Sequence, residues 1–143
     1  MLKRILQKLT DNNAIMFPPV PMEELKIVNN TLKTHNLAEI PTAYAKLLTV
    51  TDGLIWDGME LYGLHKKTRK DYAFSDILHL NLEIKETGAI KNKVIIGKTA
   101  EAFIVYDADL EKYNVLNRID FEIIDSFSNL SDALYLYVEP LFL

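Results

Sequence analysis

The sequence predicts an α+β fold: a mostly antiparallel sheet with N-terminal helices, an inserted helix and a C-terminal helix packed against it. Before residue 53, apolar residues recur at helical spacing between prolines and a glycine. Residues 93–125 instead carry four β-branched and aromatic runs separated by short polar turns. The order of these stretches lacks the alternation of a parallel βαβ sheet. Because 143 residues is the length of one ordinary domain, we expect a single domain over residues 1–143.

Two amphipathic helices are expected in the first 35 residues. The first is indicated by apolar residues at i, i+3, i+4 and i+7, namely Leu2, Ile5, Leu6 and Leu9. The segment 17–21, Phe-Pro-Pro-Val-Pro, ends this helix because proline cannot continue a helix. Pro21 suits the first turn of the second helix, whose buried face is predicted to hold Leu25, Val28 and Leu32.

A third helix and a hairpin follow directly. Pro41 is expected to open the helix and Gly53 to end it in a left-handed conformation, with Tyr44, Leu47, Leu48 and Thr51 on its buried side. Asp57-Gly58 then lies between two apolar runs. A two-residue type I′ loop needs positive φ at both positions, so this pair predicts a β-hairpin over residues 54–62.

Residues 75–88 fit two patterns. Leucine and isoleucine alternate as in a strand, but the Leu, Glu and Lys content favours a helix capped by Ser75 and ending at Gly88. We predict the helix. After it, runs at 93–97, 102–107, 113–118 and 121–125 predict an antiparallel meander, and a terminal helix is expected with Ser128 or Asn129 as its cap.

Composition excludes several classes of site. The chain has no cysteine, so it has no disulfide, thiol nucleophile or cysteine metal site. Its three histidines lie in no recognisable nucleophile, phosphate-loop or zinc-protease motif, and we therefore expect a non-enzymatic protein with no cofactor. The N-terminus does not resemble a signal peptide and no apolar run reaches the ~20 residues of a membrane helix, so a cytoplasmic location without membrane contact is expected.

Charge is unevenly distributed along the chain. Residues 1–100 hold 14 Lys and Arg against 11 Asp and Glu, whereas residues 101–143 hold 2 against 9. An acidic segment argues against direct nucleic-acid binding and suits a basic protein partner reached by electrostatic steering. The candidate partner-binding residues are Asp107, Asp109, Glu111, Asp120 and Glu122.

The stretch 40–64 resembles the SUKH superfamily. Ile40-Pro41, Tyr44, Leu47-Leu48, Asp52-Gly53 and 61–63 stand where that family has Leu-Pro, Tyr, a Leu-rich turn, Asn-Gly and a strand ending in Gly. Segments 94–97, 103–107 and 125–134 are similar to its later strands and closing helix. Ile40 and Asp52 depart from the usual Leu and Asn, and the second change would remove an amide donor.

The resemblance implies a protein-binding module, foremost an immunity protein that neutralises a toxin domain such as a basic nuclease. It also implies an alternative, a regulatory or scaffold protein in cell-wall glucan synthesis. A third hypothesis is a small-ligand sensor, with candidate ligand-binding residues Tyr44, Asp52, Gly53, Trp56 and Gly63. A structural role is favoured for the motif residues, because proline, glycine and a buried ring explain the motif by folding alone. Trp56 could be an exposed interface anchor, but cross-strand packing is favoured for it as well.

Three further clusters have simpler explanations than a site. Asp76, His79 and Glu83 share one helix face and could hold a metal, but a solvated face is favoured. The basic segment 65–70 could contact phosphate, but a solvated loop is favoured. Residues 106–111 resemble a calcium loop only in part, because they lack its central Gly and final Glu. No metal site is therefore expected.

Overall fold

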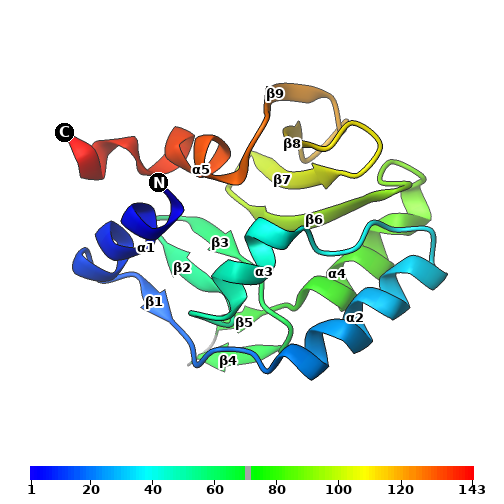
Figure 1. The fold of residues 1–143 in the computed structure, drawn as a ribbon. Helices are drawn as coiled ribbons and strands as arrows, with labels where there is room; N and C mark the ends of the chain where they lie inside the picture. The colour runs from blue at the N-terminus through cyan, green and yellow to red at the C-terminus, as the bar shows by residue number, and fades with distance from the viewer. Residues whose placement is uncertain (70–71) are drawn as a thin grey trace.

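The computed structural model describes residues 1–69 and 72–143, and it confirms the α+β class (Figure 1). The helices are α1 (Leu2–Asp11), α2 (Met22–Thr34), α3 (Thr42–Leu48), α4 (Ile77–Ile84) and α5 (Leu130–Val138), with short 3-10 helices η1 (Lys85–Thr87) and η2 (Glu139–Phe142). The strands are β1 (Ile15–Met16), β2 (Leu54–Trp56), β3 (Met59–Leu61), β4 (Lys67–Arg69), β5 (Tyr72–Phe74), β6 (Lys93–Lys98), β7 (Ala102–Asp107), β8 (Lys112–Asn117) and β9 (Ile123–Phe127).

One antiparallel sheet joins the predicted hairpin to the predicted meander. Its strand order is β1-β2-β3-β6-β7-β8-β9, and β4 and β5 form a separate pair. The junction is made by β3 and β6, where Leu61 lies opposite Gly97. A Cβ atom at residue 97 would lie 2.7 Å from the Glu60 carbonyl oxygen, so only glycine permits the two strands to approach this closely.

The helices pack in two groups around this sheet. α1 lies against α5 near the two chain ends, and α5 packs on β8 and β9. On the other side of the molecule, α2 lies beside α4, and α4 packs on β6 (Figure 1). The buried apolar side chains from all five helices and from the large sheet belong to a single core cluster.

Asn81 of α4 explains how the inserted helix is held. It is fully buried, its Nδ2 donates to the Ile95 carbonyl oxygen, and its Oδ1 accepts from the Ile95 N–H. The Asn81 amide thus forms hydrogen bonds with both the N–H and the carbonyl oxygen of Ile95, which a neighbouring strand would otherwise do. The inserted helix is therefore docked along the edge of β6 by specific hydrogen bonds as well as by apolar packing.

The hairpin turn is confirmed in detail. Asp57 and Gly58 have φ of 46° and 80°, the positive values that a type I′ turn requires. The terminal helix begins with Asn129 as its cap, one of the two predicted residues, and the Asn129 Oδ1 accepts from the Asp132 N–H at 2.9 Å.

Three element boundaries differ from the prediction. The cap of α4 is Asp76 and not Ser75, because the Asp76 Oδ1 accepts from the His79 N–H. α3 ends at Leu48, five residues before Gly53, although Gly53 does have positive φ. The last strand begins at Ile123 and not at residue 121, because Phe121 occupies the preceding turn and stacks on Phe103.

The predicted solvated loop at 65–70 was wrong for residues 67–69, whereas His65 and Lys66 are exposed and lie outside any helix or strand. Residues 67–69 form β4, which pairs with β5, while Lys70 lies outside the described residues. The Lys67 ammonium is not free in solvent. It lies over the rings of Phe17 and Phe74 and forms an ion pair with Asp52 at 3.0 Å.

Candidate functional site

Tyr44, the aromatic residue of the SUKH-like motif, is part of the core. It is fully buried, and its hydroxyl donates to the carbonyl oxygens of Tyr62 and Ile96. Burial raises the pKa of the Tyr44 phenol well above its usual value, with the Asp52 carboxylate acting in the same direction. The phenol therefore remains neutral and ties α3 to the junction of β3 and β6.

Asp52 is buried as well, and donors surround its carboxylate. Its Oδ1 accepts from the Leu64 N–H at 2.6 Å, and its Oδ2 lies 2.7 Å from His65 Nδ1 and 3.0 Å from Lys67 Nζ. These contacts use the negative charge that distinguishes Asp from the Asn of the SUKH pattern. Asp52 thus fixes the chain that leaves β3 and does not present an open binding group.

The two motif glycines permit close backbone approach. A Cβ atom at residue 53 would lie 2.6 Å from the Leu61 carbonyl oxygen, and one at residue 63 would overlap the Asp52 carboxylate. Both glycines are buried. Four of the five candidate ligand-binding residues, Tyr44, Asp52, Gly53 and Gly63, are therefore engaged in packing and hydrogen bonding within the fold.

His65 completes this network, whereas the sequence indicated it only as part of the basic segment 65–70. Its Nδ1 contacts Asp52, and its Nε2 forms an ion pair with Glu24 of α2 at 2.6 Å. The hydrogen bond to Asp52 is the largest cause that raises the pKa of His65, and Glu24 adds to it. No local motif could have revealed this, because Glu24, Asp52 and His65 are far apart in the sequence.

Trp56, the fifth candidate, lies in a different environment. It lines a surface pocket of about 300 Å³ that also includes the Asp57-Gly58 turn, the turn between β6 and β7, and Tyr137 of α5. The ring is partly buried against the core. The pocket that Trp56 lines includes neither Tyr44 nor Asp52.

The five candidate acidic residues do not form one cluster. Asp107 is only 5% exposed, and its Oδ1 accepts from the N–H groups of Asp109 and Leu110, so it shapes the turn between β7 and β8. Asp109 and Glu111 are exposed in that turn, whereas Asp120 and Glu122 are exposed in the turn between β8 and β9. β8 separates the two pairs by roughly 17 Å, from the rise per residue of an antiparallel strand.

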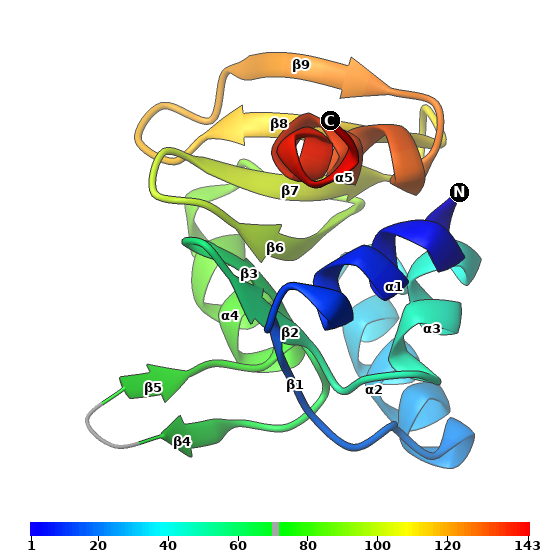
Figure 2. The ribbon, with the colours of Figure 1, turned by 90° about the vertical axis from the view of Figure 1, so that its left-hand side faces the viewer.

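β9 lies between these two acidic turns, at the outer edge of the sheet (Figure 2). It pairs only with β8 within the sheet, with Ile123 opposite Leu116 and Phe127 opposite Tyr113. Two of its apolar side chains are largely exposed: Ile123 at 60% and Ile124 at 57%. Ile119, in the preceding turn, is 91% exposed. We name residues 119–125, of which all but Phe121 are exposed, the β9 edge.

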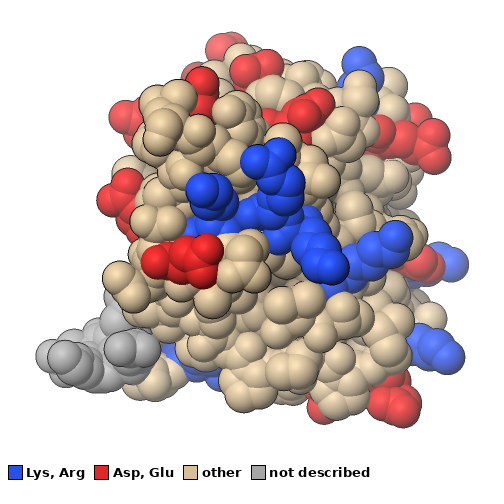
Figure 3. Space-filling view, turned by 60° about the vertical axis from the view of Figure 1, so that its left-hand side comes forward, with Lys and Arg blue, Asp and Glu red and all other residues tan. Residues whose placement is uncertain are grey.

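The positive charges gather elsewhere on the molecule. Figure 3 shows Lys and Arg side chains concentrated near the centre of the face over α1, with Asp and Glu mostly around its margin. Two of the cations of α1, Arg4 and Lys8, lie over the Phe142 ring. The uneven charge along the sequence therefore becomes an uneven charge over the surface.

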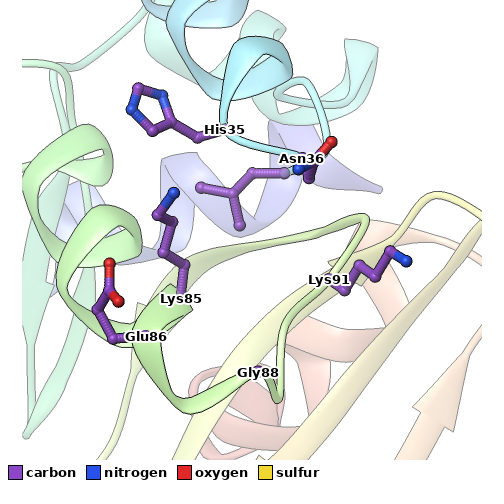
Figure 4. Close-up of a pocket in the computed structure, with 7 residues that line it drawn as sticks. His35, Asn36, Lys85, Glu86, Gly88 and Lys91 are labelled. Atoms are coloured by element: carbon purple, nitrogen blue, oxygen red, sulfur yellow. The ribbon is translucent and has the colours of Figure 1, made fainter.

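Another pocket, of about 430 Å³, lies between the end of α2 and η1. Figure 4 shows the Lys85 side chain rising toward His35, while Glu86 and Lys91 extend away from each other. His35 Nδ1 already contacts the Thr31 carbonyl oxygen at 2.8 Å. The titratable groups of this pocket do not converge on one point.

The helix face of Asp76, His79 and Glu83, predicted to be solvated, is only partly exposed to solvent. Asp76 is buried and contacts both the backbone and the ring of His79, whereas Glu83 is exposed. Among the described residues, no group of three or more His, Cys, Asp or Glu side chains is arranged to hold a metal ion. In the same part of the chain, no helix has the length and apolar character needed to cross a bilayer.

Comparison with protein-family models, with curated proteins and with solved structures gives no match to this chain. The resemblance to the SUKH superfamily stays a prediction that rests on the motif residues themselves.

Proposed function

We propose that this chain is a non-enzymatic protein-binding module that uses the β9 edge to bind a basic protein partner. The observation that carries the proposal is the exposure of Ile123 and Ile124 on an edge strand with acidic residues at both of its ends. Edge strands carry backbone groups that can pair with another chain, and exposed apolar residues favour such contacts. The same strand thus offers both backbone pairing and apolar area.

The charges around the β9 edge favour a partner of opposite sign. Asp120, Glu122 and Asp125 lie along its beginning and middle, and Glu111 lies in the turn near its far end. A negative surface attracts a basic protein over several ångströms and speeds association. Combined with the SUKH-like motif, this favours an immunity protein whose partner is a toxin domain, and a nuclease domain would supply the basic surface.

The first experiment identifies the partner. The tagged protein is captured from its native cells, and copurifying proteins are identified by mass spectrometry. A stoichiometric basic toxin domain supports the immunity function. A complex of cell-wall synthesis enzymes would instead favour the regulatory alternative and contradict the proposal.

The second experiment tests the surface with the identified partner. Charge reversal at Asp120→Lys with Glu122→Lys is expected to slow association about tenfold at low salt, within the range known for steered encounters. The matched control is Glu83→Lys with Glu86→Lys, which changes the net charge equally at exposed residues of α4 and η1. Equal association rates for the two variants would contradict a role for the β9 edge.

A further inference from the structure

The pocket beside Trp56 brings together two aromatic residues from distant parts of the chain. Trp56 ends β2, and Tyr137 lies near the end of α5, yet both line the same cavity of about 300 Å³. Both are partly buried against the core, so the fold holds their rings in place. Aromatic rings of this kind present a negatively polarised face to whatever enters between or beside them.

Carboxylates surround these rings. Asp57 and Glu101 line the pocket and are exposed at its mouth. Burial raises the pKa of the Tyr137 phenol, a hydrogen bond with the Thr99 side chain lowers it, and the carboxylates of Asp125 and Glu101 raise it further. The phenol is therefore neutral at physiological pH, and the charges contributed by the lining side chains are negative.

Two cations beside the pocket lining are held by other groups. The Arg118 guanidinium lies over the Phe103 ring and donates to the carbonyl oxygens of Thr99 and Ala100. Lys98 forms an ion pair with Glu60 at 3.2 Å. Neither side chain is part of the pocket lining, so neither neutralises Asp57 and Glu101 from within the cavity.

We propose that this pocket binds an organic cation, and that a guanidinium group fits it best. A cation is attracted to the face of tryptophan and tyrosine rings, most strongly tryptophan, and a nearby carboxylate adds charge-assisted hydrogen bonds. A guanidinium is flat, weakly hydrated and able to stack on a ring while it donates in its own plane to a carboxylate. The pocket has the volume for such a group, and its lining includes both kinds of side chain.

This cation site extends the proposed function. Only the source of the cation, an arginine side chain of the partner, rests on that function. Tyr137 belongs to α5, which packs on β9, so the pocket adjoins the β9 edge. A basic partner seated on that edge would bring arginine side chains close to the pocket. The same chemistry would also suit a free small amine, and the two sources are separated by the choice of probe.

Trp56 is the only tryptophan, so its fluorescence and its single indole N–H signal report on this pocket alone. We would titrate the full chain with N-acetyl-arginine amide, with the uncharged isostere N-acetyl-citrulline amide, and with choline. Saturable binding of the arginine amide, with a Kd on the order of millimolar as for one weakly buried cation, supports the proposal. Equal binding of the citrulline amide, or no saturable binding of any cation, overturns it.

The variant that tests the carboxylate is Glu101→Gln, which keeps the shape of an exposed side chain. It is expected to weaken arginine-amide binding about threefold, the loss of one partly exposed charge pair. Glu139→Gln removes an exposed charge from η2, outside the pocket lining, and is the matched control. Equal affinities for the two variants would contradict the assigned role of Glu101.

The probes also separate this proposal from the proposed function. If an arginine-rich peptide binds at least tenfold more tightly than the arginine amide, the cation comes from a protein partner. If choline binds most tightly, the pocket serves a free quaternary ammonium compound, and both the preference for a guanidinium and the link to a basic partner are overturned while the cation site stands. Failure of partner capture together with arginine-amide binding would contradict the proposed function alone.

Discussion

The carboxylate of Asp52 occupies the space that a side chain at Gly63 would need. A Cβ atom at residue 63 would overlap both the Asp52 carboxylate and its carbonyl group. The same carboxylate accepts a hydrogen bond from the Leu64 N–H, so it cannot move away without breaking that bond. The position of the Asp52 side chain thus requires glycine at residue 63.

Gly63→Ala should therefore destabilise the protein by about 3 kcal/mol, since overpacking at a rigid site costs 1–3 kcal/mol or more and a buried hydrogen bond is lost with it. The free energy of unfolding in urea measures this. Gly88→Ala is the control. Gly88 has φ of 76° and open space around its Cβ position, so only the backbone cost of about 1–2 kcal/mol is expected there. A smaller loss at Gly63 than at Gly88 would contradict this account.

Tyr44→Phe should cost about 1–3 kcal/mol of stability, because it removes the two buried hydrogen bonds that the hydroxyl donates to the carbonyl oxygens of Tyr62 and Ile96. Near-full retention of the secondary structure is expected, since the ring still fills the core. Tyr135→Phe in α5 serves as a comparison, because Tyr135 is only partly buried, and it should change stability by about 0.5 kcal/mol or less. Chemical denaturation of both variants, followed by circular dichroism, decides between a structural hydroxyl and a dispensable one.

His65 should make stability depend on pH. Its pKa is raised in the folded protein, chiefly by the Asp52 hydrogen bond. Its stabilising contribution is therefore fully present below the ordinary histidine pKa of about 6.5 and is lost as pH rises through the raised value. Because the side chain is about half exposed, we expect a small effect.

The measurement is the NMR titration of the His65 ring, together with unfolding of wild type and His65→Gln from acid to alkaline pH. The difference in stability between the two proteins should shrink as pH increases. Glu24→Gln removes one of the two carboxylates at the ring and should lower the pKa of His65. A His65 pKa at or below its ordinary value in the wild type would refute the network.

Ile124→Lys should weaken binding of the proposed partner by more than tenfold, because a charge replaces an apolar contact at the centre of the β9 edge. Stability should change by about 0.5 kcal/mol or less, since Ile124 is largely exposed. Ile27→Lys on α2 is the matched control, with a similar exposure of 65%. Dissociation rates measured by surface-based kinetics should differ between the two variants, and equal rates would exclude this strand from the interface.

Local patterns accounted for most helices and for the hairpin. The periodicity of Leu2 to Leu9, the prolines at 21 and 41 and the Asp57-Gly58 pair act within a few residues, so their consequences can be predicted without knowledge of the rest of the chain. Short strands such as β1 and β4 were missed because local patterns act only within a few residues. β1 has two residues and β4 has three, which is too few for a period to be visible, and they exist because a partner strand lies beside them.

By itself, the sequence determined the α+β class, the type I′ hairpin, the absence of cysteine chemistry and the acidic character of residues 101–143. These features follow from composition and short-range spacing. Only the tertiary structure decided that Asp52, Gly63 and His65 meet, that the acidic residues divide between the two turns at the ends of β8, and that Trp56 shares a pocket with Tyr137. Such contacts depend on the antiparallel pairing of distant strands and on where α5 packs, because folding sets side-chain distances that the sequence order does not contain.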